Sequence, residues 1–287
     1  MAQSGEGSST FATERQSLAP FRQMSLRSFF DANKRLKKLN LLRHLGEYGV
    51  HVEYIRLATC LLSAPDVSRV LDIAAGSNWQ FPLEYKSAFG LHLTGLDIDS
   101  DAVQSNPFLD EALVLDVCRE ALPRPDYFDL ILCYSGIEHF SDVRAFLAHG
   151  FDGLRPGGAM IAQFPSSLAP FALLNRLLPQ GVKRLALGLA FPEKTQEIGY
   201  KAYYDKCRYS EFRTAAKQAG FEVEYYLPSF LSSDYFSFFV PLYWLSSCID
   251  FVRLLFGTRY MASYNLFVLR KPGPHHRIKW SWHDIEY

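Results

Sequence analysis

Three acidic side chains stand at the ends of short apolar runs in the first half of the chain. Asp72 lies in VLDIAAGSN, Asp97 in TGLDID and Asp116 in LVLDVC. Gly76 and its small neighbours follow the first acid, and such a turn lets the backbone approach a ligand closely. In nucleotide-binding folds, an acid about 20 residues after that turn accepts hydrogen bonds from ribose hydroxyls. The spacing therefore predicts a site for a nucleoside-containing cofactor, with Asp97 at the ribose and Asp116 within reach of the base.

Glu138 and His139 form a second group that could do chemistry, directly after the apolar run FDLILCY. Histidine titrates near neutral pH, so it is a common general base where a hydroxyl group has to lose its proton. The position of the pair, just beyond a strand end, predicts that His139 acts as a base and that Glu138 supports it. An alternative stays open, in which His139 caps the following helix or packs beneath the edge of the sheet.

The elements that must position these residues alternate between strand-like and helix-like segments from residue 69 onward. This alternation is typical of a parallel sheet built from right-handed crossovers. Runs such as LILCY and MIAQF are apolar on both faces, as expected when helices cover both sides of the sheet. The predicted strands are Arg69–Ile73, His92–Leu96, Ala112–Leu115, Phe128–Tyr134, Ala159–Phe164, Glu222–Leu227 and Tyr264–Leu269.

A series of motifs in a fixed order gives the chain a family resemblance. VLDIAAGSN, TGLDID, LDVC, FDLILCYSGIEHF and LRPGGAMIAQFP follow one another between about residues 65 and 165. Together they resemble the motifs of class I, S-adenosylmethionine-dependent methyltransferases, and EFRTAAKQAGFEVEYY resembles the last crossover helix and sixth strand of that family. The resemblance implies an α/β fold. Its sheet would be seven-stranded, Rossmann-like and mostly parallel, with helices on both faces, an N-terminal helical extension and aromatic-rich insertions after strands 5 and 6.

The resemblance also assigns roles to individual positions. Asp72 would orient the methionine amino group of S-adenosyl-L-methionine, Asp97 would hold the ribose, and Asp116 with its neighbour would hold the adenine. Tyr134 and its neighbour would line the path of the methyl group. The implied cofactor-binding residues are Asp72, Ala74, Gly76, Asn78, Asp97, Ile98, Asp116, Val117, Tyr134 and Ser135.

The turn after the first strand departs from the family pattern at two positions. Ala74 and Asn78 stand where the family usually has glycine. Alanine costs little there unless its backbone has a positive φ. Asparagine tolerates the left-handed region better than most residues, so Asn78 is expected to replace a glycine in that conformation. The site is expected to be competent, although the two changes leave a non-catalytic version open.

Other classes of protein fit the sequence less well. Lysine and arginine number 30, and aspartate and glutamate also number 30, so the basic surplus of a nucleic-acid binder is missing. The chain has no G-x-G-x-x-G turn of the kind found in nicotinamide-dependent dehydrogenases. The cysteines are scattered without C-x-x-C spacing, which predicts neither a disulfide framework nor a zinc site. Nucleic acid and metal are therefore not expected ligands.

The composition divides the chain into four parts. We expect a disordered leader at 1–20, a helical region at 21–64, the methyltransferase domain at 65–271 and a C-terminal extension at 272–287. Within the domain, the segments at about 165–220 and 228–263 exceed what a crossover connection needs, which predicts insertions there. In the family, the region over the acceptor pocket corresponds to GYKAYYDKCRYSEF. Tyr203, Tyr204 and Arg208 are therefore candidate substrate-binding residues, and any of them could instead be ordinary surface.

Two apolar segments in these insertions bear on the acceptor. Leu168–Phe191 is apolar but punctuated by cations, and Phe236–Phe256 is rich in aromatic residues. Two interpretations stay open: the segments pack on each other as a lid, or they contact a bilayer or a long-chain substrate. Asp250 and Arg253 interrupt the second segment, which argues against a membrane-spanning helix.

The sequence as a whole predicts an enzyme that methylates a small-molecule, glycan or lipid-linked acceptor, with oxygen as the expected acceptor atom. The alternative is a non-catalytic cofactor-binding subunit that docks on a partner or a membrane through its apolar insertions. The first residues lack the basic segment and apolar run of a secretory signal, so the expected location is the cytoplasm, with peripheral membrane contact left open. The oligomeric state is also left open.

Overall fold

The computed structural model describes residues 49–177, 201–236 and 239–273. The strands are β1 (Arg69–Ile73), β2 (His92–Asp97), β3 (Glu111–Val114), β4 (Phe128–Tyr134), β5 (Leu154–Pro165), β6 (Glu222–Ser229) and β7 (Tyr264–Arg270). The helices are α2 (Val50–Leu62), α3 (Glu84–Phe89), α4 (Ser100–Gln104), α5 (Val143–Gly153), α6 (Pro170–Leu177), α8 (Tyr209–Gln218) and α9 (Val240–Phe256), with short 3-10 helices η3 (Ile137–His139), η6 (Ser233–Phe236) and η7 (Arg259–Met261). The predicted leader lies outside the described residues, as do residues 21–48 and 274–287.

The strands form one seven-stranded sheet in the order β3-β2-β1-β4-β5-β7-β6. The pairs among β1 to β5 are parallel, whereas β7 runs antiparallel to both of its neighbours. The predicted fold, a mostly parallel Rossmann-like sheet with helices on both faces, is confirmed. Because β1, β2 and β4 are parallel, their carboxyl ends meet at one edge of the sheet, and this edge brings the sequence motifs together.

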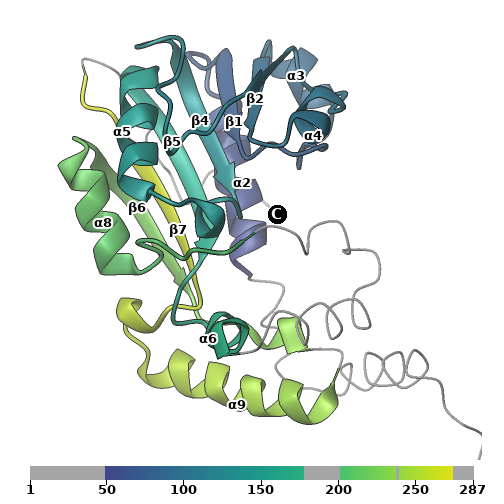
Figure 1. The fold of residues 1–287 in the computed structure, drawn as a ribbon, viewed down its shortest axis with the longest axis vertical. Coiled ribbons are helices and arrows are strands. Elements are labelled where there is room, and N and C mark those ends of the chain that lie inside the picture. The colour runs from purple at the N-terminus through teal and green to yellow at the C-terminus, as the bar shows by residue number, and fades with distance from the viewer. Residues whose placement is uncertain (1–48, 178–200, 237–238, 274–287) are drawn as a thin grey trace, which may run out of the picture.

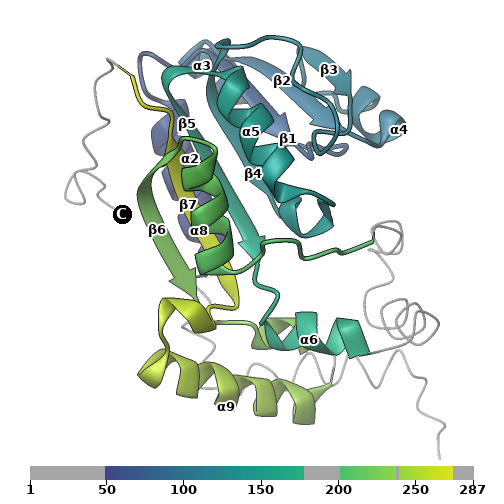
Figure 2. The same cartoon turned by 60° about the vertical axis from the view of Figure 1, so that its left-hand side comes forward.

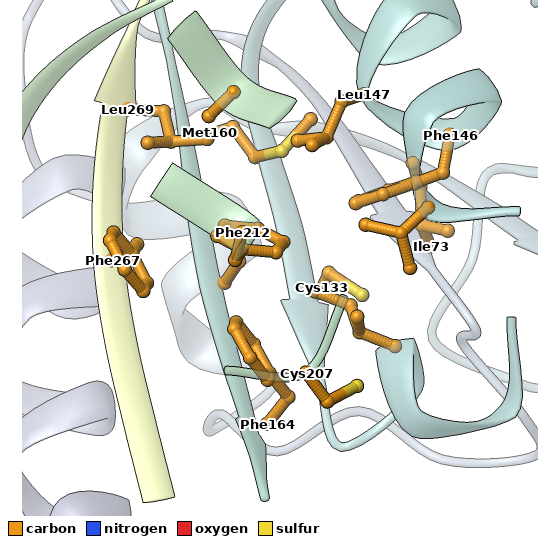
Figure 3. Close-up of a cluster of buried hydrophobic side chains, with 14 of the residues drawn as sticks. Ile73, Cys133, Phe146, Leu147, Met160, Phe164, Cys207, Phe212, Phe267 and Leu269 are labelled. Atoms are coloured by element: carbon orange, nitrogen blue, oxygen red, sulfur yellow. The ribbon is translucent and has the colours of Figure 1, made fainter. Parts of the chain in front are cut away.

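Helices cover both faces of the sheet, as Figures 1 and 2 show. On one face lies α2, which buries Tyr54, Leu57 and Leu61 at helical spacing against β4, β5 and β7. On the other face α5 and α8 pack on the sheet and on each other. Figure 3 shows part of the core on that side, where side chains of β5 and β7 meet those of α5 and α8. The rings of Phe164 and Phe212 lie 4.5 Å apart there.

The fifth strand begins earlier than its apolar run predicts. The sequence predicts its start at Ala159, but β5 begins at Leu154, which pairs with Phe128. The register then shifts between Phe128 and Leu130. Gly157, with a φ of 80°, gives the irregular stretch a backbone conformation that side-chain-bearing residues adopt at a cost. The part of a strand that precedes such an irregularity is not visible in a continuous apolar run.

A small layer of helices lies beyond the carboxyl end of β5, formed by α6, η6 and α9 (Figures 1 and 2). The Arg253 Nη2 atom of α9 donates to the Leu168 carbonyl at 3.1 Å, and the rings of Phe171 and Tyr235 stack at 4.8 Å. The two apolar segments therefore meet, although residues 178–191 of the first lie outside the described residues. No helix in the described part of the chain is long and apolar enough to cross a membrane.

Candidate functional site

The turn after β1 is built on two left-handed residues. Ala74 has a φ of 61° and Gly76 a φ of 53°. The Gly76 N–H donates to Asp97 Oδ2 at 2.9 Å, and the Ala75 N–H donates to the Leu96 carbonyl at 3.1 Å, so the turn is tied to the end of β2. Asn78 lies outside the left-handed region, and the expectation that it would replace a glycine in that conformation is wrong. The residue that takes over the left-handed role of a glycine is Ala74.

Ala74 therefore carries a backbone strain. A left-handed conformation costs a residue with a Cβ roughly 1–2 kcal/mol. The neighbouring chain accommodates the Ala74 methyl group because residue 136 is a glycine, where a Cβ would lie only 2.6 Å from that of Ala74. A glycine at position 74 would adopt the same left-handed conformation without this strain.

We expect Ala74→Gly to raise the free energy of unfolding by about 0.5–1 kcal/mol, because relief of the left-handed strain exceeds the added flexibility of the unfolded chain. Urea denaturation of both proteins measures the difference. Ala75→Gly is the matched control, since Ala75 is buried and its φ is not positive. That variant should lose about 1 kcal/mol. Equal losses in both variants would contradict the assignment of strain to Ala74.

Asp72 and Asp97 lie near the carboxyl ends of the neighbouring strands β1 and β2. Asp97 accepts hydrogen bonds from two backbone N–H groups, Gly76 on Oδ2 and Asp99 on Oδ1, at 2.9 and 3.0 Å. Asp72 is buried, and burial raises the pKa of its carboxyl to about 8, with a further rise from the charge of Asp97. The described part of the chain places no cation against Asp72 that would counteract these effects. Two acids with this environment fit a ligand that brings a positive charge.

The third acid lies at the end of the next strand, on a partly exposed turn. Asp116 accepts the Cys118 N–H on Oδ1 at 3.0 Å and pairs with Arg119 at 3.4 Å. Val117 is buried, and its carbonyl lies 2.8 Å from His149 Nδ1. Beside Asp97, the apolar side chain of Ile98 is 63 % exposed. The structure thus places the acid Asp116 beyond β3 and the exposed apolar side chain of Ile98 beyond β2. An adenine ring bound there would have both a polar and an apolar neighbour.

The end of β4 places Tyr134 and Ser135 beside the turn. Ser135 has a φ of 52°, and its Oγ donates to Gln163 Oε1 at 2.9 Å. The Tyr134 ring packs against Tyr54 of α2 with the ring centroids 4.9 Å apart.

Tyr54 is a candidate that sequence reasoning missed, because it occupies an ordinary apolar position of a helix. It is fully buried, and its hydroxyl has no hydrogen-bond partner in the described structure. Burial, followed by the charge of Asp72, raises its pKa.

Glu138 and His139 lie in the 3-10 helix η3, directly after β4. Burial raises the pKa of the Glu138 carboxyl to about 7, and its Oε2 atom has no hydrogen-bond partner in the described structure. The His139 Nδ1 lies 3.2 Å from the Lys201 carbonyl. Because a carbonyl can only accept, Nδ1 carries the proton in this contact. The pKa of His139 is lowered, chiefly by burial, which keeps the ring neutral.

The candidate substrate-binding residues divide between the site and the surface. The backbone N–H groups of Tyr203 and Tyr204 both donate to the Glu138 carbonyl, at 2.8 and 3.0 Å. The Tyr204 side chain is buried, and burial, followed by the charge of Glu138, raises its pKa. The Tyr203 side chain is exposed, and Arg208 donates from Nε to Ser167 Oγ at 3.1 Å. The structure thus brings Tyr204 to Glu138, but leaves Tyr203 in contact through its backbone alone.

A shallow groove of about 540 Å³ lies elsewhere, between α8, β6 and the end of α9. Tyr209, Tyr226 and Arg259 line it together with Arg213. None of the acids described above reaches it, so we place the candidate site at the strand ends, where buried titratable groups gather, and not in this groove.

The fold and the three acids are typical of a protein that binds a nucleoside-containing cofactor on a Rossmann-like sheet. Comparison with known families shows which family the chain belongs to. A family model described as a methyltransferase domain matches residues 47–226, more than half of the 287 residues. The chain therefore belongs to the methyltransferase domain family and is an S-adenosylmethionine-dependent methyltransferase. This finding favours an enzyme over the non-catalytic subunit that the sequence left open. A search of curated proteins finds no match.

Solved structures with a similar fold share little sequence with the chain. An S-adenosylmethionine-dependent methyltransferase from Mesorhizobium loti is 15 % identical, with 76 % of this chain and 97 % of that chain covered and a TM-score of 0.48. A chain of the complex between the Haloferax volcanii Trm112 methyltransferase activator and a putative methyltransferase is 19 % identical, with 88 % and 100 % covered and a TM-score of 0.48. The cyclopropane synthase MmaA2 from Mycobacterium tuberculosis is 16 % identical, with 77 % and 84 % covered and a TM-score of 0.47.

The residues present fit S-adenosylmethionine. Its sulfonium and amino groups are cationic, and Asp72 is a buried acid whose pKa is raised to about 8 in the absence of a cation. The unpartnered hydroxyl of Tyr54 offers a further polar contact beside Asp72. When bound, S-adenosylmethionine supplies a methyl group on a sulfonium sulfur that needs no further activation.

Proposed function

We propose that this methyltransferase methylates a hydroxyl oxygen of a small-molecule, glycan or lipid-linked acceptor. We further propose that the carboxyl ends of β1, β2 and β3 hold the cofactor through Asp72, Asp97 and Asp116, with Gly76 at the turn. The acceptor lies on the side of η3 and Tyr204. This placement follows the general rule that open α/β sheets bind ligands outside the carboxyl ends of their strands.

The single observation that carries the proposal is the state of Glu138. Its Oε2 is buried without a partner, and its pKa is about 7. A hydroxyl acceptor loses its proton as its oxygen takes the methyl group, and a base whose pKa lies near the working pH assists that step best. Glu138 accepts this proton, while bound S-adenosylmethionine would supply the methyl group to the acceptor oxygen and leave as S-adenosylhomocysteine.

In this proposal Glu138 is the base, and His139 positions the loop. Its Nδ1 proton is held by the Lys201 carbonyl, on the chain segment that also binds the Glu138 carbonyl through Tyr203 and Tyr204. The two residues thus join η3 to the segment that begins at residue 201. The sequence alone favours His139 as base because histidine titrates near neutral pH; burial moves the pKa of Glu138 into the same range.

The proposal is tested by incubating the protein with S-adenosylmethionine carrying a ¹³C-labelled methyl group and with matched acceptors that differ only in a hydroxyl, amine or thiol group. The panel includes free sugars, phenols and lipid-linked sugars. We expect labelled product from hydroxyl acceptors, identified by mass spectrometry and by the ¹³C shift of the methyl group. Label found only on nitrogen, sulfur or carbon would overturn oxygen as the acceptor atom and leave the family assignment intact.

A further inference from the structure

The polarity of α9 is inverted relative to that of an ordinary surface helix. Its buried positions are Tyr243, Ser246, Ser247 and Asp250, all of which carry polar groups. Asp250 is fully buried and accepts the Ser232 N–H and the Ser233 N–H on Oδ2, at 2.8 and 2.7 Å. A surface helix of a globular protein normally buries its apolar stripe and exposes its polar residues. Within this polar stripe, Asp250 fixes α9 to Ser232 and Ser233, at the start of η6.

The outward face of α9 is apolar along its whole length. Trp244 is 53 % exposed and Phe256 is 77 % exposed. The other exposed apolar side chains of the helix are Leu245, Ile249, Phe251, Val252, Leu254 and Leu255, and Tyr260 and Met261 of the following η7 are also exposed. A helix of 17 residues is about 25 Å long. Figures 1 and 2 show that it lies along one end of the molecule, with the sheet on its other side.

The exposed charge in the segment that contains α9 and η7 is positive. In residues 239–263, all of which are described, the acid is Asp250 and it is buried, while the cations are Arg253 and Arg259. Arg259 is exposed and bonds the Tyr209 hydroxyl at 2.9 Å. Arg253 is partly buried and donates to Ser263 Oγ and to the Leu168 carbonyl, so Arg259 is the exposed charge of the segment. An apolar face followed by an exposed arginine, with no exposed acid in this segment, complements a layer of anionic headgroups over hydrocarbon.

A protein partner fits this face less well. Protein interfaces carry about one hydrogen bond per 100–200 Å² and a polar rim. Among the exposed side chains of α9, Trp244 offers an indole N–H and Cys248 a weak thiol, and the others have no polar atom. Tryptophan on the apolar face of a helix is typical of helices that lie in a bilayer interface.

We propose that α9 docks the enzyme on a lipid bilayer, with the helix parallel to the membrane plane and its apolar face in the headgroup and acyl boundary. The occupant of this face is the bilayer itself, and a second copy of the chain is the competing outcome. The helix does not span the membrane, since its polar side is fixed to the protein by Asp250 and Arg253.

Docking in this orientation turns the acceptor side of the site towards the lipid, a step that rests on the proposed function. Between Glu138 and α9 lies an aromatic layer formed by Tyr204, Tyr235 and Tyr264, with Phe171 5.4 Å from Tyr264. The same hydrophobic cluster includes the buried Tyr243 of α9. These contacts link Glu138 to the end of the molecule on which α9 lies, so a bilayer under α9 would lie near the acceptor side of the site. The acceptor class expected from this geometry is lipid-linked or amphiphilic.

The test is flotation of the full-length protein with vesicles of phosphatidylcholine and of phosphatidylcholine with phosphatidylglycerol. We expect co-flotation with both, several-fold stronger with the anionic lipid because of the exposed Arg259. The variant Leu245→Glu/Val252→Glu should lose at least about tenfold in vesicle binding, because it places two charges in the acyl boundary. Leu83→Glu is the matched control, since Leu83 is an exposed apolar residue at the start of α3, and it should float like the wild type.

Two further measurements keep the outcomes distinct. Titration with S-adenosylhomocysteine reports whether each variant is folded and whether the cofactor site is intact, independently of the membrane. Light scattering after size exclusion reports the oligomeric state. A concentration-dependent dimer that the double variant abolishes, without vesicle binding by the wild type, would overturn the proposal in favour of a second copy. Vesicle binding that the double variant retains would also overturn it. Neither result depends on whether the acceptor atom is oxygen.

Discussion

Asp97→Ala is expected to weaken the binding of S-adenosylmethionine and S-adenosylhomocysteine by about 100-fold or more. The Asp97 carboxylate accepts the Gly76 N–H, which fixes the turn, and the Asp99 N–H, which fixes the chain entering α4. We propose that it also accepts from the ribose hydroxyls. Hydrogen bonds to a charged group contribute about 1.5–3 kcal/mol each, and about 1.4 kcal/mol corresponds to a tenfold change in affinity. Loss of one ribose contact and of the preformed turn therefore accounts for the expected loss.

Isothermal titration calorimetry with both ligands measures this effect. Asp101→Ala is the control, because Asp101 is an exposed acid of the adjacent α4 and its removal changes the net charge equally. It should bind within about twofold of the wild type, since exposed charges far from a ligand are screened by salt. Unchanged binding by Asp97→Ala, with the same protein folded by circular dichroism, would remove Asp97 from the cofactor site.

The strands were predictable because their signal is local. β1 and β4 match the predicted limits, and β2 differs by one residue at one end. Their apolar runs are buried on both faces by helices, so the pattern is continuous and ends at the turn residues. The acids at the strand ends followed from the same pattern, because once the sheet is parallel, all the carboxyl ends lie at one edge.

Features that depend on contacts between distant segments could not be predicted. The φ of Ala74 is such a feature, since the turn is held by Asp97 on another strand. Tyr54 reaches the site only because α2 crosses the sheet beside β4. In α9 the sequence shows an apolar segment, but which face is buried is decided by the bonds of Asp250 to Ser232 and Ser233. A periodic pattern gives the direction of an apolar face and not the identity of what covers it.

Glu138→Gln is the second change with a large expected effect, and it should separate catalysis from binding. Glutamine has nearly the same shape but cannot accept a proton at neutral pH, so kcat for a hydroxyl acceptor should fall by about 10²–10⁴-fold. The affinity for S-adenosylhomocysteine should stay within about twofold, because Glu138 is not among the proposed cofactor residues.

In the wild type, kcat/KM should rise with pH through about pH 7, since the base works only when its carboxyl is deprotonated. His139→Asn keeps an N–H donor near the position of Nδ1, towards the Lys201 carbonyl, and should lose less activity than Glu138→Gln. The opposite order would return the role of base to His139.

The same substitution should stabilise the protein above neutral pH, which a merely structural role for a charged Glu138 would not produce. Its pKa is about 7 in the folded protein and 4.5 in its ordinary state, so the folded protein binds the proton more tightly than the unfolded chain. The free energy of unfolding therefore falls as pH rises from about 4.5 to 7 and stays lower above that range, by up to roughly 3 kcal/mol. Glutamine carries no charge at any of these pH values, so Glu138→Gln should match the wild type near pH 4.5 and exceed it at pH 8.

Urea denaturation at both pH values measures this difference, with Glu84→Gln as the control because Glu84 is an exposed acid of α3. The contribution of Asp72, whose pKa is also raised, is common to all three proteins and cancels in the comparison. A Glu138→Gln variant that has lost its activity but is more stable than the wild type at pH 8 would show that the buried carboxylate lowers the free energy of unfolding. That result would support the proposal that Glu138 is retained as the base for methyl transfer to a hydroxyl group. A variant that is less stable than the wild type at pH 8 would instead mean that the Glu138 charge is stabilised in the fold, and the proposal of a base would fail with it.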